Sequence, residues 1–190
     1  DDLGALEQDV RSFDATELDK VSSQYFTWHA AVRDYLLGLI SWKRGDDAAL
    51  QLYADRFSSA WSDEGPIVAS FGHELQGLVA WREGDLEGAL VHMENVLGDF
   101  AWMEMFATLP GRSTFFWFTA DILIELERFE DAIKYLEYSS NLANYQWRAP
   151  GVIRQGEVYE LMGNPEAAIE RYERVAKIWS AADEELRPQV

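Results

Sequence analysis

Two similar stretches of the chain decide how its fold is interpreted. The first is SWKRGDDAALQLY, at Ser41–Tyr53, and the second is AWREGDLEGALVHM, at Ala80–Met93. Each has a tryptophan and a basic residue before a Gly-Asp pair, and an Ala-Leu pair after it. Glycine can adopt the left-handed conformation that ends a helix, and the aspartate beside it can cap the next helix. Each stretch therefore predicts two helices joined by a tight turn.

The same arrangement recurs in four units along the chain. Each unit has a small residue seven positions before the turn, a turn residue, a small residue early in the second helix, and a large apolar residue four positions later. Small residues let two helices cross closely, because no bulky side chain separates their backbones. In chain order the four positions are Gly38, Gly45, Ala49 and Tyr53; Gly77, Gly84, Ala89 and Met93; Ala120, Glu127, Ala132 and Leu136; and Gly156, Gly163, Ala168 and Tyr172.

These units resemble the tetratricopeptide repeat, which has the same small residues, turn glycine and large apolar residue. The resemblance implies an all-α fold, an α-solenoid of antiparallel helix pairs over residues 31–190, with turns near 45, 84, 127 and 163. The family period is about 34 residues, whereas the turns here are 39, 43 and 36 residues apart. Glu127 replaces a turn glycine, and Ser41 and Ala80 stand where the family often has an aromatic residue.

The two ends of the chain carry further expectations. Residues 1–30 are predicted to form an N-terminal helical cap, with Asp14 or Thr16 starting a helix, because a terminal repeat otherwise leaves its apolar face in water. The closing YERVAKIWSAADEELRPQV, residues 172–190, is similar to repeat segments that follow bacterial serine/threonine kinase or transcriptional-activation domains. That similarity implies a sensory or docking module. The chain has none of the kinase phosphate-loop, HRD or DFG motifs.

Composition narrows the classes of partner. The formal charge is −18 and the isoelectric point about 4.4, so the chain repels phosphate backbones and we expect no nucleic-acid partner. No apolar run reaches the roughly 20 residues of a membrane span, so no membrane insertion is expected.

There are no cysteines, which removes disulfides and thiolate metal sites. A cytoplasmic location is expected, or an exported one if the start DDLG is a processed end.

Few residues have the spacing that catalysis or metal binding requires. The histidines are His29, His73 and His92. HELQG, at His73–Gly77, begins like a zinc-protease helix but lacks the second histidine four positions on. Carboxylates are abundant, yet no hydrophobic surroundings single out a pair whose pKa values would be separated. We therefore predict a non-catalytic protein with no metal and no cofactor.

A binding groove follows from the family resemblance. In the family, the first helix of each unit lines a concave surface, and counting from its small residue gives the positions that face it. The resulting surface has aromatic residues toward one end and carboxylates toward the other. Such a groove suits a helix or extended peptide with an apolar side and a basic end. Its predicted members are Tyr35, Leu39, Trp42, Lys43, Glu74, Leu78, Trp81, Arg82, Trp117, Asp121, Glu125 and Glu157. For Trp42 and Trp81, packing on the next repeat is an equally good prediction.

Three functions fit these observations. The first is a non-catalytic module that binds a peptide or partner protein in the groove. The second is a regulatory, self-associating segment of a larger bacterial signalling protein, for which the Phe-, Met- and Trp-rich stretch at residues 95–111 offers an apolar surface. The third is an acidic and aromatic groove for a small ligand. Burial of residues 95–111 is the alternative to their exposure.

Overall fold

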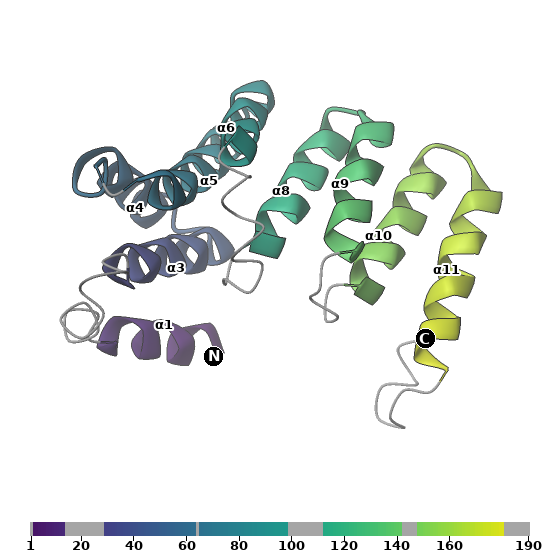
Figure 1. Ribbon diagram of the computed structural model, residues 1–190, viewed down its shortest axis with the longest axis horizontal. Helices are drawn as coiled ribbons and strands as arrows, with labels where there is room; N and C mark the ends of the chain where they lie inside the picture. The colour runs from purple at the N-terminus through teal and green to yellow at the C-terminus, as the bar shows by residue number, and fades with distance from the viewer. Residues whose placement is uncertain (1, 14–28, 64, 99–111, 142–147, 181–190) are drawn as a thin grey trace. The chain divides into compact units, whose positions relative to one another are not determined.

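The computed structural model describes residues 2–13, 29–63, 65–98, 112–141 and 148–180. Within these ranges the chain forms nine helices and no strand (Figure 1), so the predicted all-α class is confirmed. The chain divides into two compact units, unit 1 at Asp1–Met105 and unit 2 at Phe106–Val190.

Within each unit, helices that follow one another in sequence pack against each other. In unit 1, α3 packs on α4, α4 on α5 and α5 on α6, while α3 also contacts α1 and α5. In unit 2, α8 packs on α9, α9 on α10 and α10 on α11. The helices are α1 (Asp2–Ser12), α3 (His29–Arg44), α4 (Asp47–Ser59), α5 (Pro66–Glu83), α6 (Leu86–Gly98), α8 (Arg112–Glu125), α9 (Phe129–Asn141), α10 (Arg148–Leu161) and α11 (Pro165–Trp179).

The structure has a left-handed residue at each of the four expected turn positions. The φ angles are 72° at Gly45, 83° at Gly84, 56° at Glu127 and 68° at Gly163. At every turn this residue donates its N–H to the carbonyl three positions earlier, and the next residue donates to the carbonyl five positions earlier. These bonds satisfy the last carbonyls of the first helix, which is why one residue with positive φ suffices to end it.

Side-chain caps begin the helix that follows three of these turns. The Asp46 carboxylate accepts a hydrogen bond from the N–H of Ala49 at 3.0 Å, and the Asp85 carboxylate accepts one from Gly88 at 2.9 Å. The Asn164 amide oxygen accepts from Ala167 at 3.2 Å, directly before Pro165 at the first position of α11. Residues near each of these turns therefore specify both where the first helix ends and where the second helix begins.

Glu127 is the one turn residue that is not glycine, and it provides a test of the turn. A side chain in the left-handed region costs about 1–2 kcal/mol, while glycine loses about 0.5–1 kcal/mol more backbone entropy on folding. Glu127→Gly is therefore expected to raise the free energy of unfolding by up to about 1 kcal/mol in urea denaturation followed by circular dichroism.

The matched control for this substitution is Glu173→Gly. Glu173 is exposed in the interior of α11, where glycine is expected to lower the free energy of unfolding by about 1 kcal/mol. If both substitutions destabilised the protein equally, backbone strain at residue 127 would not contribute to stability.

Close helix contacts occur at the predicted small residues, though not always with the expected neighbour. A Cβ on Gly77 would lie 3.3 Å from the carbonyl oxygen of Ala89 on α6, as expected within one helix pair. A Cβ on Gly38 would instead lie 2.7 Å from Leu75 on α5. Gly38 therefore serves the contact between α3 and α5, because these two first helices also pack on each other.

Aromatic side chains hold the core of unit 1 together. Tyr35 of α3 stacks on Phe71 of α5 with ring centroids 4.6 Å apart, and Phe57 of α4 meets Phe71 edge-on at 6.4 Å. In the same unit, the buried carboxylate of Asp34 accepts hydrogen bonds from Arg56 at 3.1 Å and from the Trp61 indole at 3.0 Å. These contacts join α3, α4 and α5 through side chains far apart in sequence.

Unit 2 has its own core. Phe115 and Phe116 of α8 lie near Tyr135 of α9, with ring centroids 6.4 Å from the tyrosine. Further along, Val152 of α10 and Val175 of α11 are buried together. Each unit therefore buries an apolar core of its own.

Only part of the predicted N-terminal cap belongs to the described residues. Helix α1 packs on α3, and Glu7 forms ion pairs with Arg44 of α3 and Arg11 of its own helix. No residue of α1 is buried. The helix start expected at Asp14 or Thr16, residues 99–111 of the apolar stretch, and residues 181–190 all lie outside the described ranges.

Across the parts of the chain that are described, no helix combines the length and apolarity needed to cross a membrane.

Candidate interaction surface

The twelve residues predicted for the groove fall into three groups by exposure. Tyr35, Glu74 and Leu78 are buried, with exposed fractions of 1%, 3% and 0%. Leu39, Trp42, Trp81, Trp117, Asp121 and Glu157 are half-buried, and Lys43, Arg82 and Glu125 are exposed. The last two groups remain candidates for a surface that a partner can touch.

The three buried residues belong to the core of unit 1 rather than to a groove. Helix α5 contacts α3, α4 and α6, so neighbours cover most of its circumference, including the positions of Glu74 and Leu78. Tyr35 of α3 is covered by its stacking partner Phe71. Counting positions from a small residue identifies a helix face, but it does not reveal how many neighbours cover that face.

Trp42, Trp81 and Arg82 come together in unit 1. The rings of Trp42 on α3 and Trp81 on α5 have centroids 5.0 Å apart and are inclined by 32°. The guanidinium carbon of Arg82 lies 4.3 Å from the centroid of the Trp42 ring, within the range of a cation–π contact. With the neighbouring exposed Lys43, these residues form what we call the tryptophan shelf: Trp42, Lys43, Trp81 and Arg82.

Arg82 fixes the geometry of the shelf. Its Nη2 donates to the carbonyl oxygen of Trp42 at 2.8 Å, and its Nε lies 3.3 Å from the Asp47 carboxylate. The Trp42 carbonyl belongs to the last turn of α3, where the helix carries a partial negative charge that favours a cation. The Arg82 side chain of α5 therefore contacts both the end of α3 and the start of α4, and its guanidinium lies over the Trp42 ring.

The repeated sequence phrase thus describes a contact between the repeats. Trp42 belongs to the first copy of the phrase, while Trp81 and Arg82 belong to the second. The two rings pack on each other and both side chains remain half-buried, while a groove position for Trp42 and Trp81 stays a prediction.

A second cluster lies in unit 2, between α8 and α10. Arg154 of α10 forms ion pairs with Asp121 of α8 at 2.6 Å and with Glu157 of its own helix at 2.7 Å. Burial alone would lower the pKa of the Arg154 guanidinium, but hydrogen bonds to Glu157 and Asp121 outweigh burial and raise it. Two predicted groove carboxylates are therefore bound to a cation that the sequence prediction missed. The signal was the spacing of Arg154 three positions before Glu157 on one helix.

The remaining candidates are single positions along the same helices. Trp117 and Glu125 lie four positions before and after Asp121 on α8, so the three side chains follow one side of that helix. Leu39 lies on α3, three positions before Trp42.

No metal centre is formed by the described residues. These ranges contain no group of three or more His, Asp or Glu side chains placed to hold an ion. His73 of α5 and His92 of α6 do lie together, with ring centroids 6.0 Å apart, but two imidazoles alone do not complete a zinc site.

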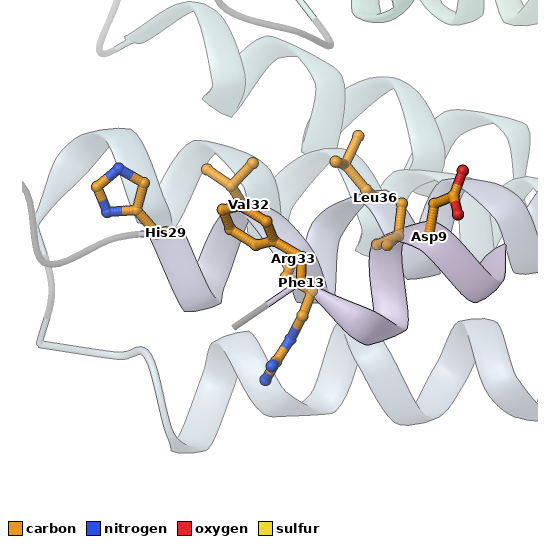
Figure 2. Close-up of a pocket in the computed structure, with 7 residues that line it drawn as sticks. Asp9, Phe13, His29, Val32, Arg33 and Leu36 are labelled. Atoms are coloured by element: carbon orange, nitrogen blue, oxygen red, sulfur yellow. The ribbon is translucent and has the colours of Figure 1, made fainter. Parts of the chain in front are cut away.

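A cavity of about 370 Å³ lies between α1 and α3 in unit 1 (Figure 2). The surface that lines it is apolar, although polar residues contribute the non-polar parts of their side chains. The lining residues are Asp9, Val10, Phe13, His29, Val32, Arg33 and Leu36.

Comparison with known proteins adds no further site residue: no protein-family profile matches the chain, and no curated protein matches it.

Proposed function

We propose that this chain is a non-catalytic protein-interaction module that binds a peptide or a partner protein through the first helices of tetratricopeptide-like helix pairs. The observation that carries the proposal is the tryptophan shelf, where two indoles in contact remain half-buried and the Arg82 guanidinium lies over the Trp42 ring. Tryptophan and arginine are the residues most enriched at the energetic centres of protein interfaces. Two rings that already pack on each other also lose little side-chain entropy on binding, because their geometry is already fixed.

The repeat architecture supports the same function. The four helix pairs share one turn geometry, with a left-handed residue at the end of the first helix. In each unit the first helices are also linked directly, through Trp42 and Trp81 in unit 1 and through Asp121 and Arg154 in unit 2. We interpret these links as the side-by-side first helices of a short solenoid in each unit, which present one continuous face to a partner.

Charge suggests the chemistry of the partner. The whole chain carries −18, so its field attracts cationic segments and accelerates their association. In unit 2, Arg154 offsets only one of the two negative charges of Asp121 and Glu157, and Glu125 of α8 is exposed, so basic side chains of a partner would meet a net negative surface there. The partner we propose has an apolar side chain for the shelf and a net positive charge.

The proposal predicts that loss of either indole weakens binding strongly. Peptides selected from a display library against the full chain supply a ligand whose dissociation constant is then measured by calorimetry. Trp42→Ala or Trp81→Ala is expected to raise that constant at least about 30-fold, because central interface residues contribute about 2 kcal/mol or more.

Leu52→Ala is the matched control. Leu52 is an exposed apolar residue on α4, a second helix of the same unit, with an exposed fraction of 58%. Its replacement is expected to leave the dissociation constant within about threefold, since residues outside an interface contribute little. If the Leu52 variant lost binding while folded Trp42 and Trp81 variants retained it, the shelf would not be the binding surface.

A further inference from the structure

The contact between α5 and α6 contains two histidines that lie near each other. His73 of α5 and His92 of α6 have ring centroids 6.0 Å apart and planes inclined by 35°. Gly77, one turn after His73, lies so near α6 that a Cβ on it would be 3.3 Å from the Cβ of His92. The two helices are therefore closely packed beside the two rings.

Both rings bury a nitrogen that has no acceptor. The Nδ1 atoms of His73 and His92 are buried and make no hydrogen bond to any described residue. A neutral imidazole can leave one nitrogen as an unused acceptor at modest cost. An imidazolium has two N–H donors, so protonation would place a buried donor without an acceptor on each ring, together with two like charges at close range.

We propose that His73 and His92 form a pH-sensitive contact, and that protonation of these rings weakens the pairing of α5 with α6. Because α5 also carries Trp81 of the tryptophan shelf, the same protonation would loosen the helix that supplies half of that surface. The contact itself is independent of the proposed function, since it depends only on the α5–α6 packing.

Other titratable groups lie near the pair. Burial lowers the pKa of His92, the neighbouring His73 lowers it further, and Asp85 in the preceding turn acts in the opposite direction. On α5 itself, Glu74 follows His73 and is buried. Among the polar contacts that α3 and α4 make with α5, Gln76 meets the neutral Ser58, and Arg82 binds the Trp42 carbonyl and pairs with Asp47.

The direction of the pH effect follows from proton binding in the two states. An unfolded histidine titrates near 6.5, and the folded His92 has a lower pKa. As the pH falls below about 6.5, the unfolded state binds protons first, so stability present above that pH is lost until the folded group is protonated as well. The equilibrium constant for unfolding rises by about tenfold for each unit of difference between the two pKa values.

The test compares urea denaturation at about pH 7.5 and about pH 5.5. The wild-type chain and the control variant His29→Gln, which changes the third histidine, are expected to lose midpoint concentration on acidification. The midpoint concentrations of His73→Gln and His92→Gln are expected to fall less, because the one histidine that remains in the pair has no second imidazolium beside it. Equal losses in all four proteins would overturn the proposal.

A second measurement uses only the wild-type chain, so it holds even if a variant fails to fold. The ring resonances of the three histidines are followed by NMR while the pH is lowered, and hydrogen exchange is recorded for the amides of α5 and α6. The His92 ring is expected to titrate below about 6.5, with loss of amide protection in α5 and α6 over the same range. Titration of the His92 ring at the unperturbed value, with unchanged protection of the amides in α5 and α6, would contradict the inference.

Discussion

Replacing Gly72 by alanine is expected to lower the free energy of unfolding of unit 1 by about 1–3 kcal/mol, the usual cost of overpacking a core. Gly72 lies on α5 where it meets α4, and a Cβ at this position would be 2.7 Å from the Cβ of Phe57. The Phe57 Cβ is attached directly to the backbone of α4 and cannot rotate away, so the two helices must separate. This loss exceeds the gain of up to about 1 kcal/mol that alanine brings over glycine inside a helix.

Gly77→Ala is the matched comparison, on the same helix and also at a close contact. Its nearest neighbour is the flexible tip of Met93, at 2.9 Å, which can swing aside, while the Ala89 carbonyl oxygen is farther away at 3.3 Å. A smaller loss is therefore expected there. The measurement is urea denaturation combined with hydrogen exchange of amides in α4 and α5, because the two units need not unfold together. A larger loss of stability for Gly77→Ala than for Gly72→Ala would show that the α4–α5 contact is not tighter than the α5–α6 contact.

Replacing Asp34 by alanine is expected to lower the free energy of unfolding by about 2–4 kcal/mol. The Asp34 carboxylate is 1% exposed and accepts hydrogen bonds from both Arg56 and Trp61. Hydrogen bonds to a charged group contribute about 1.5–3 kcal/mol each. Part of that is recovered, because the Arg56 side chain is 42% exposed and can reach water when its partner is removed.

Asp131→Ala separates burial from the mere number of ion pairs. Asp131 also binds two cations, Arg128 at 3.0 Å and Lys134 at 2.8 Å, but its side chain is 38% exposed. Hydrogen bonds from Lys134 and Arg128 lower its pKa, yet solvent screens exposed pairs, so a loss of only about 0.2–1 kcal/mol is expected. Denaturation in low and high salt checks the distinction: the Asp131 effect shrinks with salt, while the Asp34 effect persists. Equal losses for the two variants would refute the role assigned to burial.

The shelf and the core respond differently to these changes, which helps to separate function from stability. Gly72 and Asp34 affect the packing of α3, α4 and α5, whereas Trp42 and Trp81 are half-buried at the ends of α3 and α5. A variant that loses peptide binding without a change in urea midpoint therefore reports on the surface. A variant that loses both peptide binding and urea midpoint reports on the helix packing that supports the surface.

The sequence by itself determined the helix pairs. Turn residues, caps and small residues act on their chain neighbours, within about seven positions, so Gly84, Asp85 and Ala89 can be interpreted without knowing the rest of the fold. The same local signal located the turn at Glu127, where glycine is missing but the spacing remains. It also placed Trp42 and Trp81 at equivalent positions of two successive helix pairs.

Only the tertiary structure decided which of those positions stay accessible. Tyr35, Glu74 and Leu78 share the predicted face, yet they are buried because several helices pack around α3 and α5. Arg154 reaches Asp121 from 33 positions away in sequence, and no local pattern identifies that partner. The physical reason is one of range: helix ends depend on hydrogen bonds between near neighbours in the chain, whereas burial and ion pairing depend on which distant helices come together.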